Sequence, residues 1–225
     1  MNRREFLTGI GAASVGAAWF GSRGGDVSAD IPDFLNREQV SLRNQNRSTV
    51  ACCNGVVCTS QPLASMAGLS ILQAGGNAVD AAICANAMLG LVEPMSCGPG
   101  GDLFAILWVE KEHKLFGLNA SGRAPYEWNL EAADKLGLKR IDPYSPLSWS
   151  VPGCASGWQA LLERFGTMKA AALLEWPIRY AKEGFPVSSI IADDWGFEPD
   201  KFPSLAAAFT VDGNIPQYGD MFRNP

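Results

Sequence analysis

The feature that most constrains the fold is the segment between Ser60 and Leu91, which is rich in small residues. The pair Gly75-Gly76 divides it into two parts. Small and apolar side chains recur there at the four-residue spacing of a helix face, and the paired glycines end the first segment. The sequence therefore predicts helices over residues 63–74 and 78–91, the second capped by Asn77. Their small side chains let each backbone approach a neighbour closely, so the second helix is expected to be buried.

The composition predicts a folded chain with many tight turns. Of 225 residues, 47% are hydrophobic and 18% are charged, and the chain contains 24 glycines and 14 prolines. The net charge of −5 gives no general positive field, which argues against a nucleic-acid partner. No apolar stretch is long enough to cross a bilayer, so no membrane span is expected.

The amino-terminal segment, residues 1–29, resembles a twin-arginine export signal. Arg3 and Arg4 precede a weakly apolar run over residues 7–20, and a small-residue cleavage site follows at residues 27–29. A short buried or anchoring helix is the alternative. The signal predicts a periplasmic or secreted protein, with a polar linker or arm over residues 30–48 and a folded domain over 49–225.

Further elements follow from turn residues and hydrophobic spacing. Asn54-Gly55 predicts a tight turn between two short β-prone runs, and residues 103–110 and 115–119 predict a hairpin. Helices are expected over 155–165 and 167–182, and no closing element is expected after Asp200. The glycines at 98–101 lack phosphate-loop spacing, so Gly100 and Gly101 are interpreted as points of close backbone approach.

Few residues are candidates for acid–base, nucleophilic or metal chemistry. The one histidine, His113, falls in the charged turn of the predicted hairpin, where a solvated role is favoured over a catalytic one. No metal site is predicted, because the cysteines lack paired zinc-ligand spacing; buried free thiols are favoured over disulfides. The cysteines are Cys52, Cys53, Cys58, Cys84, Cys97 and Cys154.

Arg123 is the main candidate for binding a ligand. It follows the second hairpin strand, where its planar guanidinium could hold a carboxylate through two parallel hydrogen bonds. A surface ion pair explains its position equally well from the local sequence alone.

Six segments, in order and spacing, resemble the large-subunit motifs of γ-glutamyltransferases, also called γ-glutamyl transpeptidases or glutathione hydrolases. The resemblance runs from about Thr49 to Pro225. The segments are Ser60-Gln61-Pro62-Leu63-Ala64-Ser65, Gly75-Gly76-Asn77-Ala78-Val79-Asp80-Ala81-Ala82, Val92-Glu93-Pro94, Gly98-Pro99-Gly100-Gly101, Val151-Pro152-Gly153 with Ser156-Gly157, and Glu183-Gly184-Phe185-Pro186-Val187.

The resemblance implies an α+β fold, the αββα type of N-terminal-nucleophile hydrolases, of which this chain is an incomplete large-subunit portion. A family precursor cleaves itself before a threonine, which becomes the nucleophile of a small subunit and needs no cofactor. None of the five threonines here adjoins another, unlike the family's Thr-Thr-His type motif. The nucleophile is therefore expected beyond Pro225, and this chain alone is expected to be inactive.

The resemblance also assigns a role to the hairpin end. Typical members have an arginine four residues before the proline, holding the α-carboxylate of the glutamyl group. Here that place is Ser121, and Arg123 lies two residues before Pro125. A two-residue shift along a strand keeps the same face, about 7 Å away, so Arg123 is expected to substitute, helped by Ser121 and Asn119.

Three functions fit these observations. The first is part of an enzyme that transfers the γ-glutamyl group of glutathione or a similar amide to water or amino acids. The second is an acylase of the same fold, acting on a cephalosporin side chain or a poly-γ-glutamate, which the displaced arginine favours. The third is a truncated protein with only a binding or structural role.

Overall fold

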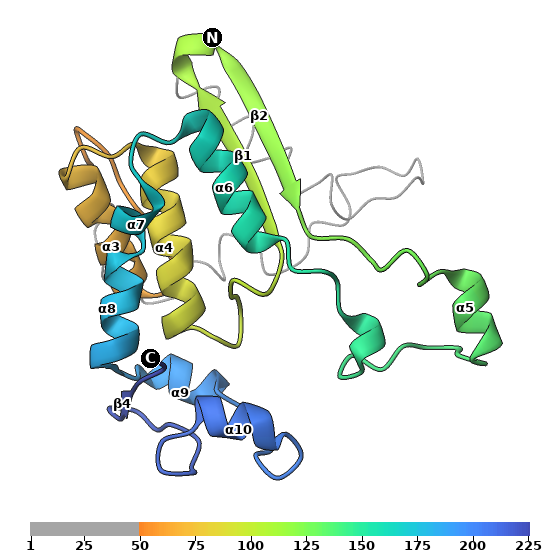
Figure 1. The fold of residues 1–225 in the computed structure, drawn as a ribbon. Helices are drawn as coiled ribbons and strands as arrows, with labels where there is room; N and C mark the ends of the chain where they lie inside the picture. The colour runs from red at the N-terminus through yellow and green to blue at the C-terminus, as the bar shows by residue number, and fades with distance from the viewer. Residues whose placement is uncertain (1–49) are drawn as a thin grey trace, which may run out of the picture. The chain divides into compact units, whose positions relative to one another are not determined.

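The computed structural model describes residues 50–225, so the export signal and the linker predicted over residues 1–48 lie outside the described part. Residues Cys52–Pro225 form one compact unit. Figure 1 shows its helices and strands. They are α3 (Pro62–Gln73), α4 (Ala78–Val92), β1 (Leu103–Val109), the 3-10 helix η2 (Glu110–Glu112), β2 (Lys114–Ala120), α5 (Leu130–Lys135), the 3-10 helix η3 (Pro146–Ser148), α6 (Cys154–Phe165), α7 (Ala170–Leu173), α8 (Glu175–Glu183), β3 (Phe185–Pro186), α9 (Ser189–Asp194), α10 (Pro203–Phe209) and β4 (Met221–Phe222).

Helices α3 and α4 pack closely, as their small residues predict. The Gln61 side chain caps α3 by accepting a hydrogen bond from the Leu63 amide (2.6 Å), and Pro62 occupies the first turn, where its missing N–H costs nothing. A Cβ on Gly68 would lie 3.1 Å from the Ala81 carbonyl oxygen, so the contact depends on glycine. Met88 of α4 is fully buried in the core between the helices.

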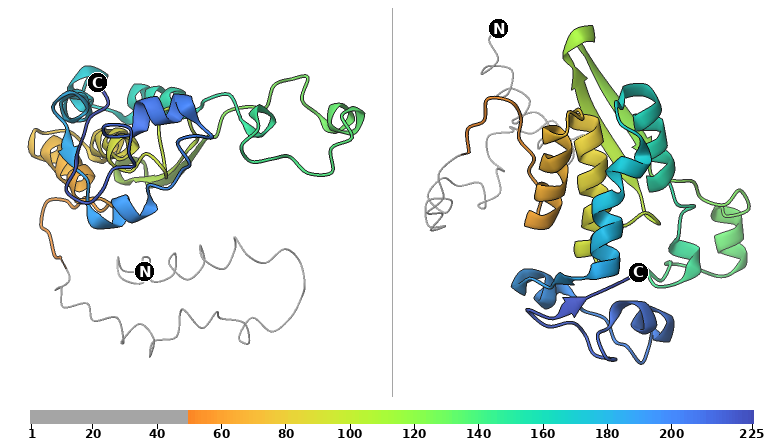
Figure 2. Two further views of the ribbon diagram at one scale, coloured as in Figure 1. Left: turned by 90° about the horizontal axis from the view of Figure 1, so that it is seen from below. Right: turned by 60° about the vertical axis from the view of Figure 1, so that its left-hand side comes forward.

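The predicted hairpin is confirmed. Strands β1 and β2 pair antiparallel from Leu103 opposite Ala120 to Val109 opposite Lys114. His113 closes the turn with a left-handed φ of 47° and is exposed, as expected of a solvated residue. Figures 1 and 2 show α6 and α4 on one side of the hairpin.

The other face of the hairpin carries exposed apolar side chains. Strand residues alternate between the two faces, so β1 presents Leu103, Ala105 and Leu107 to the helices and the residues between them to the opposite side. On that opposite side Phe104 is 67% exposed and Ile106 is 81% exposed. A sheet with such a face needs a second layer to cover it.

The buried Asp80 carboxylate links the start of α4 to the connection between α6 and α7. It accepts hydrogen bonds from the Asn77 amide (2.9 Å) and from the Thr167 amide (3.1 Å) and hydroxyl (2.5 Å). The Asn77 side chain caps α4 in return, completing a capping box, and donates to the Phe165 carbonyl (2.6 Å). Residues nearly ninety positions apart are thereby held together.

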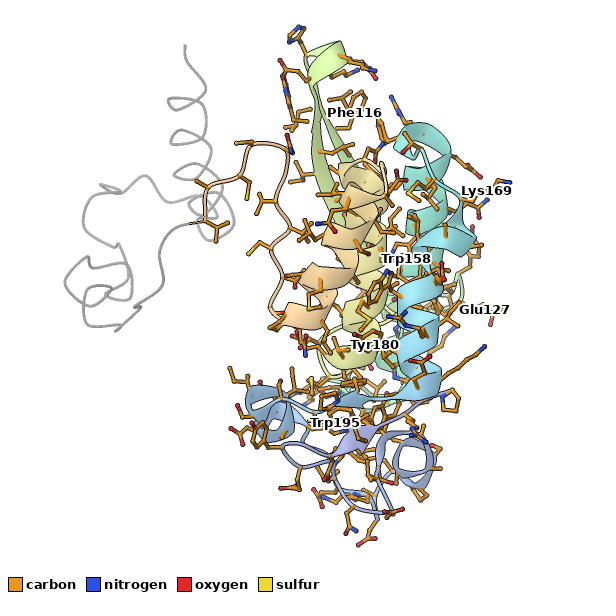
Figure 3. All side chains as sticks on the ribbon, turned by 90° about the vertical axis from the view of Figure 1, so that its left-hand side faces the viewer. Phe116, Glu127, Trp158, Lys169, Tyr180 and Trp195 are labelled. Carbon is orange, nitrogen blue, oxygen red and sulfur yellow. The ribbon has the colours of Figure 1, made fainter. Side chains whose placement is uncertain are left out.

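The carboxyl-terminal residues form a small lobe around aromatic rings. Strand β4 pairs with β3, so that Phe222 is fully buried against Phe185, Trp195 and Phe209, with ring centroids 5.8, 4.7 and 6.2 Å away. Figure 3 shows Trp195 inside this lobe. The expectation that no element closes the chain after Asp200 is wrong, because α10 and β4 both follow it.

Three other local predictions differ from the structure. Residues 50–60 form no strand; Val57 lies against Gly68 of α3 instead of pairing in a hairpin. The helix expected over 167–182 is divided at Leu174, and α8 begins so that Pro177 falls in its first turn, where it needs no N–H partner. Close backbone approach was predicted at Gly100 and Gly101, and only Gly101 shows it, through the hydrogen bonds that its carbonyl accepts from Gly153 and Cys154. A Cβ on Gly100 would meet nothing within 4 Å, whereas a Cβ on Gly90 would lie 3.2 Å from Gly98.

Residues 124–149 form an arm that extends away from the helices and carries α5 at its far end (Figures 1 and 2). Its returning limb contacts the carboxyl-terminal lobe where the Tyr144 and Phe202 rings lie 5.6 Å apart. Several apolar side chains of the arm are exposed, among them Tyr126 and Leu130. No helix among residues 50–225 has the length and apolar character needed to cross a membrane.

Candidate active site

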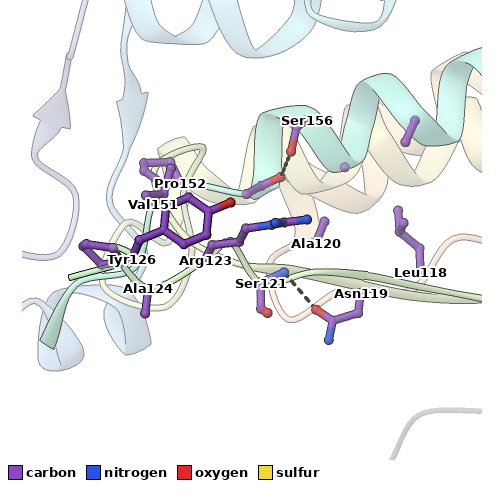
Figure 4. A pocket seen from close by; sticks show the side chains of 15 residues that line it. Leu118, Asn119, Ala120, Ser121, Arg123, Ala124, Tyr126, Val151, Pro152 and Ser156 are labelled. Carbon is purple, nitrogen blue, oxygen red and sulfur yellow. Dashed lines mark hydrogen bonds between the residues drawn. The ribbon is translucent and has the colours of Figure 1, made fainter. Parts of the chain in front are cut away.

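A pocket of 660 Å³ lies where β2 ends and α6 begins. Two segments far apart in the sequence form it: residues 118–126, which continue β2, and residues 151–160, which lead into α6 (Figure 4). The three residues singled out from the sequence, Arg123, Ser121 and Asn119, all line it. The other lining residues are Leu118, Ala120, Gly122, Ala124, Pro125, Tyr126, Val151, Pro152, Gly153, Ser156, Gly157 and Ala160.

Arg123 reaches this pocket by a turn and not along a strand. Strand β2 ends at Ala120, and Gly122 has a left-handed φ of 77°, so the alternation of a strand does not continue to Arg123. The expectation that Arg123 shares a strand face with position 121 is therefore wrong in its geometry, although both residues line the pocket. The Val151 amide donates to the Arg123 carbonyl (2.8 Å) and fixes the backbone there.

Glycines allow the two segments to meet. A Cβ on Gly122 would overlap the Val151 carbonyl oxygen, and a Cβ on Gly153 would overlap the Ala120 carbonyl oxygen. The amides of Gly153 and Cys154 both donate to the Gly101 carbonyl, at 3.1 and 3.0 Å. The glycine turn at 98–101 and the Val-Pro-Gly motif thus form one junction beneath the pocket.

The one charged side chain that lines the pocket is a hydrogen-bond donor, the guanidinium of Arg123. Figure 4 shows the Arg123 side chain directed toward the start of α6. The Asn119 side-chain oxygen accepts from the Ser121 amide (3.0 Å), which leaves the Asn119 NH₂ group available, and the Ser156 hydroxyl donates to the Gly153 carbonyl (2.7 Å). No Asp or Glu is among the lining residues, and no ion pair between described residues involves Arg123.

This arrangement suits binding of a carboxylate. An exposed guanidinium with a neighbouring hydroxyl and amide can donate several hydrogen bonds to one anionic group. The serines that line the pocket have no histidine beside them; His113 is at the opposite end of β2. The pocket is therefore suited to recognition, and none of its lining residues is a histidine, aspartate or glutamate that could act as a base for its serines.

Sequence reasoning did not single out Ser156 or Tyr126 as site residues. Ser156 occupies the first turn of α6, three residues after Gly153, and Tyr126 follows Pro125 at the root of the arm. The position of Ser156-Gly157 just after Val151-Pro152-Gly153 could have identified Ser156, because that motif leads directly into α6. Tyr126 had no local signal, since its place depends on the turn at Gly122.

Comparison with known proteins identifies the family. The family model described as gamma-glutamyltranspeptidase matches residues 64–225, which is most of the chain. The chain belongs to the γ-glutamyltranspeptidase family. The resemblance seen in the motifs is thereby confirmed.

The relatives of this chain include proteins named as acylases and proteins named as glutathione hydrolases. The chain is 36% identical over 177 residues to Acylase ACY 1 proenzyme of Pseudomonas sp. (strain SE83), covering 73% of this chain and 32% of that protein. It is 31% identical over 174 residues to the glutathione hydrolase proenzyme of Bacillus subtilis, covering 74% and 30%. The chain therefore spans about a third of the length of these relatives.

Solved structures agree with the fold. The γ-glutamyltranspeptidase of Helicobacter pylori superposes with a TM-score of 0.72 at 28% identity, covering 79% of this chain and 52% of that one. The cephalosporin acylase of Bacillus halodurans gives 0.68 at 36% identity, covering 80% and 37%. The expected α+β fold of an N-terminal-nucleophile hydrolase is confirmed, and the described residues provide helices and a two-stranded part of a sheet.

Proposed function

We propose that this chain is the amino-terminal portion of the large subunit of an enzyme that cleaves γ-glutamyl amides such as glutathione and transfers the glutamyl group to water or an amino acid. The observation that carries the proposal is the position of Arg123 in a pocket with Ser121 and Asn119, at the end of the family's hairpin. The pocket offers a carboxylate a cation and neutral donors with no competing acid among its lining residues.

In this proposal the described residues bind and orient the donor, and the rest of the protein performs the acyl transfer. Arg123 holds the α-carboxylate, and Ser121 and Asn119 add hydrogen bonds to it. A threonine exposed by self-cleavage of the precursor, on a segment outside this sequence, attacks the γ-carbonyl with its own α-amine as base. The amine product leaves, and water or an amino acid releases the glutamyl group from the enzyme. No cofactor takes part.

Steady-state kinetics of Arg123→Ala and Arg123→Lys in the complete protein test the proposal. Removing the guanidinium leaves the donor carboxylate without its charged partner, which we expect to cost about 2 to 4 kcal/mol of transition-state stabilisation. That loss lowers kcat/KM on a γ-glutamyl anilide by roughly thirty- to a thousandfold. Lysine cannot reproduce two parallel hydrogen bonds, so Arg123→Lys should recover little.

Arg140→Ala is the matched control, because Arg140 is an exposed arginine of the arm that does not line the pocket. Self-cleavage, followed on a gel, should proceed in all three variants, since it does not use the donor carboxylate. Near wild-type kcat/KM in both Arg123 variants would overturn the assignment of this residue.

An acylase acting on a different amide is the second candidate. Two observations favour it: the arginine is displaced by two residues from its usual place, and relatives at 36% identity are named an acylase and a cephalosporin acylase. Hydrolysis of a γ-glutamyl anilide and of a cephalosporin side-chain amide by the complete protein, compared at equal concentration, separates the two candidates. A kcat/KM at least tenfold higher on the cephalosporin amide would decide for the acylase.

We also propose that the protein is exported through the twin-arginine route and cleaved near Ala29. The support is the Arg3-Arg4 pair, the weakly apolar run and the small residues before Asp30. Replacing both arginines by lysine should keep the protein in the cytoplasm, as shown by cell fractionation and a blot. Arg23→Lys, a change within the same segment, should leave export intact. Unchanged export of the double-lysine variant, or a mature terminus far from Asp30, would refute this route.

A further inference from the structure

The arm over residues 124–149 begins directly after Arg123 and ends directly before Ser150. Where it ends, the Ser150 hydroxyl donates a hydrogen bond to the Asp102 carboxylate (3.2 Å). Among the described residues, the side-chain hydrogen bonds of the arm itself all stay within the arm. The bond between Ser150 and Asp102 therefore joins the end of the arm to the rest of the fold.

Asp102 lies at a well-anchored point of the backbone. It is between the glycine turn of residues 98–101 and β1, which begins at Leu103. The Gly101 carbonyl accepts hydrogen bonds from the amides of Gly153 and Cys154, at 3.1 and 3.0 Å, and so connects the residue before Asp102 to the start of α6. A carboxylate accepts a hydrogen bond from a hydroxyl more strongly than a neutral oxygen does, so Asp102 is suited to hold Ser150 in place.

The Ser150 side chain also lies against the turn that brings Arg123 into the pocket. A Cβ on Gly122 would lie 3.4 Å from the Ser150 hydroxyl oxygen and would overlap the Val151 carbonyl oxygen. The Val151 amide in turn donates to the Arg123 carbonyl (2.8 Å). Contacts therefore continue from Asp102 through Ser150 and Val151 to the backbone of Arg123.

We propose that Asp102 is a positioning residue for Arg123 and acts through Ser150 and Val151. This role rests on the proposed function, in which Arg123 holds the carboxylate of the substrate. Asp102 does not line the pocket, and no ion pair between described residues joins it to Arg123, so the guanidinium stays available to the substrate. Asp102 affects the reaction by fixing the direction in which Arg123 enters the pocket.

Steady-state kinetics of the complete protein on a γ-glutamyl anilide test this role. Asp102→Ala should raise KM by about three- to tenfold, the effect of losing one hydrogen bond, and should leave kcat within about twofold, because the carboxylate is held in the ground state as well as in the transition state. Ser150→Ala removes the donor and should have the same effect. Asp102→Asn keeps an acceptor oxygen and Ser150→Thr keeps the hydroxyl, so both should stay near wild type.

A double-mutant cycle with Arg123→Ala separates positioning from a general structural role. When the guanidinium is absent, Asp102→Ala should change kcat/KM by less than about twofold, because Asp102 acts through Arg123. Asp134→Ala, at an exposed aspartate of α5, is the matched control and should leave KM unchanged. The proposal would be overturned by a full effect of Asp102→Ala in the Arg123→Ala background, or by a wild-type KM in both Asp102→Ala and Ser150→Ala.

Hydrogen exchange of the complete protein, resolved to single residues, tests the same contacts without a substrate. Asp102→Ala should speed exchange of the Val151 amide by about three- to tenfold. The amides of Gly153 and Cys154, which the Gly101 carbonyl holds, are internal references and should exchange as in wild type. Unchanged exchange at Val151 would overturn the positioning role. Faster exchange at Val151 in a protein that does not cleave the γ-glutamyl anilide would contradict the proposed function alone.

Discussion

At the scale of single residues, Asp80 shows how much of this structure depends on one buried charge. Its carboxylate is inaccessible to solvent, and burial acts to raise its pKa. The hydrogen bonds from Thr167, Asn77 and Met168 outweigh burial and leave the pKa below its usual value of 3.8. A carboxylate stabilised in this way contributes to folding only while it is ionised.

We expect Asp80→Asn to destabilise the complete protein by about 2 to 4 kcal/mol at pH 7. The amide carries one acceptor oxygen in place of two, so part of the donor set from Asn77, Thr167 and Met168 loses its partner inside the core. Urea unfolding measures the difference. Asp193→Asn, at an exposed aspartate of α9, is the matched control and should change stability by less than about 0.5 kcal/mol.

The loss of stability caused by Asp80→Asn should depend on pH. Because the folded pKa of Asp80 is lowered, the carboxylate contributes its full stabilisation above about pH 4 and loses it as the pH falls through the folded pKa. The stability difference between wild type and Asp80→Asn should therefore be constant from pH 5 to 7 and shrink below pH 4. A difference that stays constant down to pH 2 would contradict this account.

At Arg123 the structure bears on the position of the residue and not on its predicted role, and the predicted local geometry is wrong. The sequence predicted that Arg123, helped by Ser121 and Asn119, binds a carboxylate. The structure places all three residues in the lining of one pocket, and the carboxylate role stays a prediction. The turn at Gly122 was not predicted, because its left-handed conformation follows from the close approach of Val151, nearly thirty residues later. A local sequence pattern carries no information about such a contact.

At the scale of elements, the predictions that held are those determined by neighbouring residues. The α3–α4 pair, its Asn77 cap and the β1–β2 hairpin all depend on contacts within about thirty residues. Among the elements that were not predicted, β3 and β4 pair residues 185–186 with residues 221–222, and neither strand contains a hydrophobic run long enough to predict it. Turn-forming residues at 54–55 predicted a hairpin that packing against α3 prevents.

The uncovered face of the hairpin leads to a prediction for the isolated 225-residue chain. Phe104 and Ile106 stand on that face with large exposed fractions, so the chain should bind a hydrophobic dye and tend to aggregate. Replacing both by threonine, which keeps reasonable strand propensity, should reduce dye fluorescence severalfold. Val50→Thr, at an exposed residue outside the hairpin, should not. A monomer that unfolds cooperatively and binds no dye would contradict the prediction.

At the scale of the whole molecule, the described residues correspond to one portion of the fold of the family's solved structures. They span about a third of the length of the relatives, and they supply a helical layer, a two-stranded part of a sheet and the arm over residues 124–149. The exposed apolar face and the arm are the two surfaces on which further layers of such a fold can pack. The family motifs predicted the family and its fold, because the motifs keep their order and spacing across the chain.

The link between Asp80 and Thr167 has a consequence for the protein while it is being made. The two residues are 87 positions apart, so α4 leaves the ribosome long before the segment that satisfies its buried carboxylate. At synthesis rates of about 5 to 20 residues per second, the delay is roughly 4 to 17 seconds. Throughout that interval α4 lacks its packing against α6, α7 and α8, so the apolar face that it buries against them stays exposed on the nascent chain.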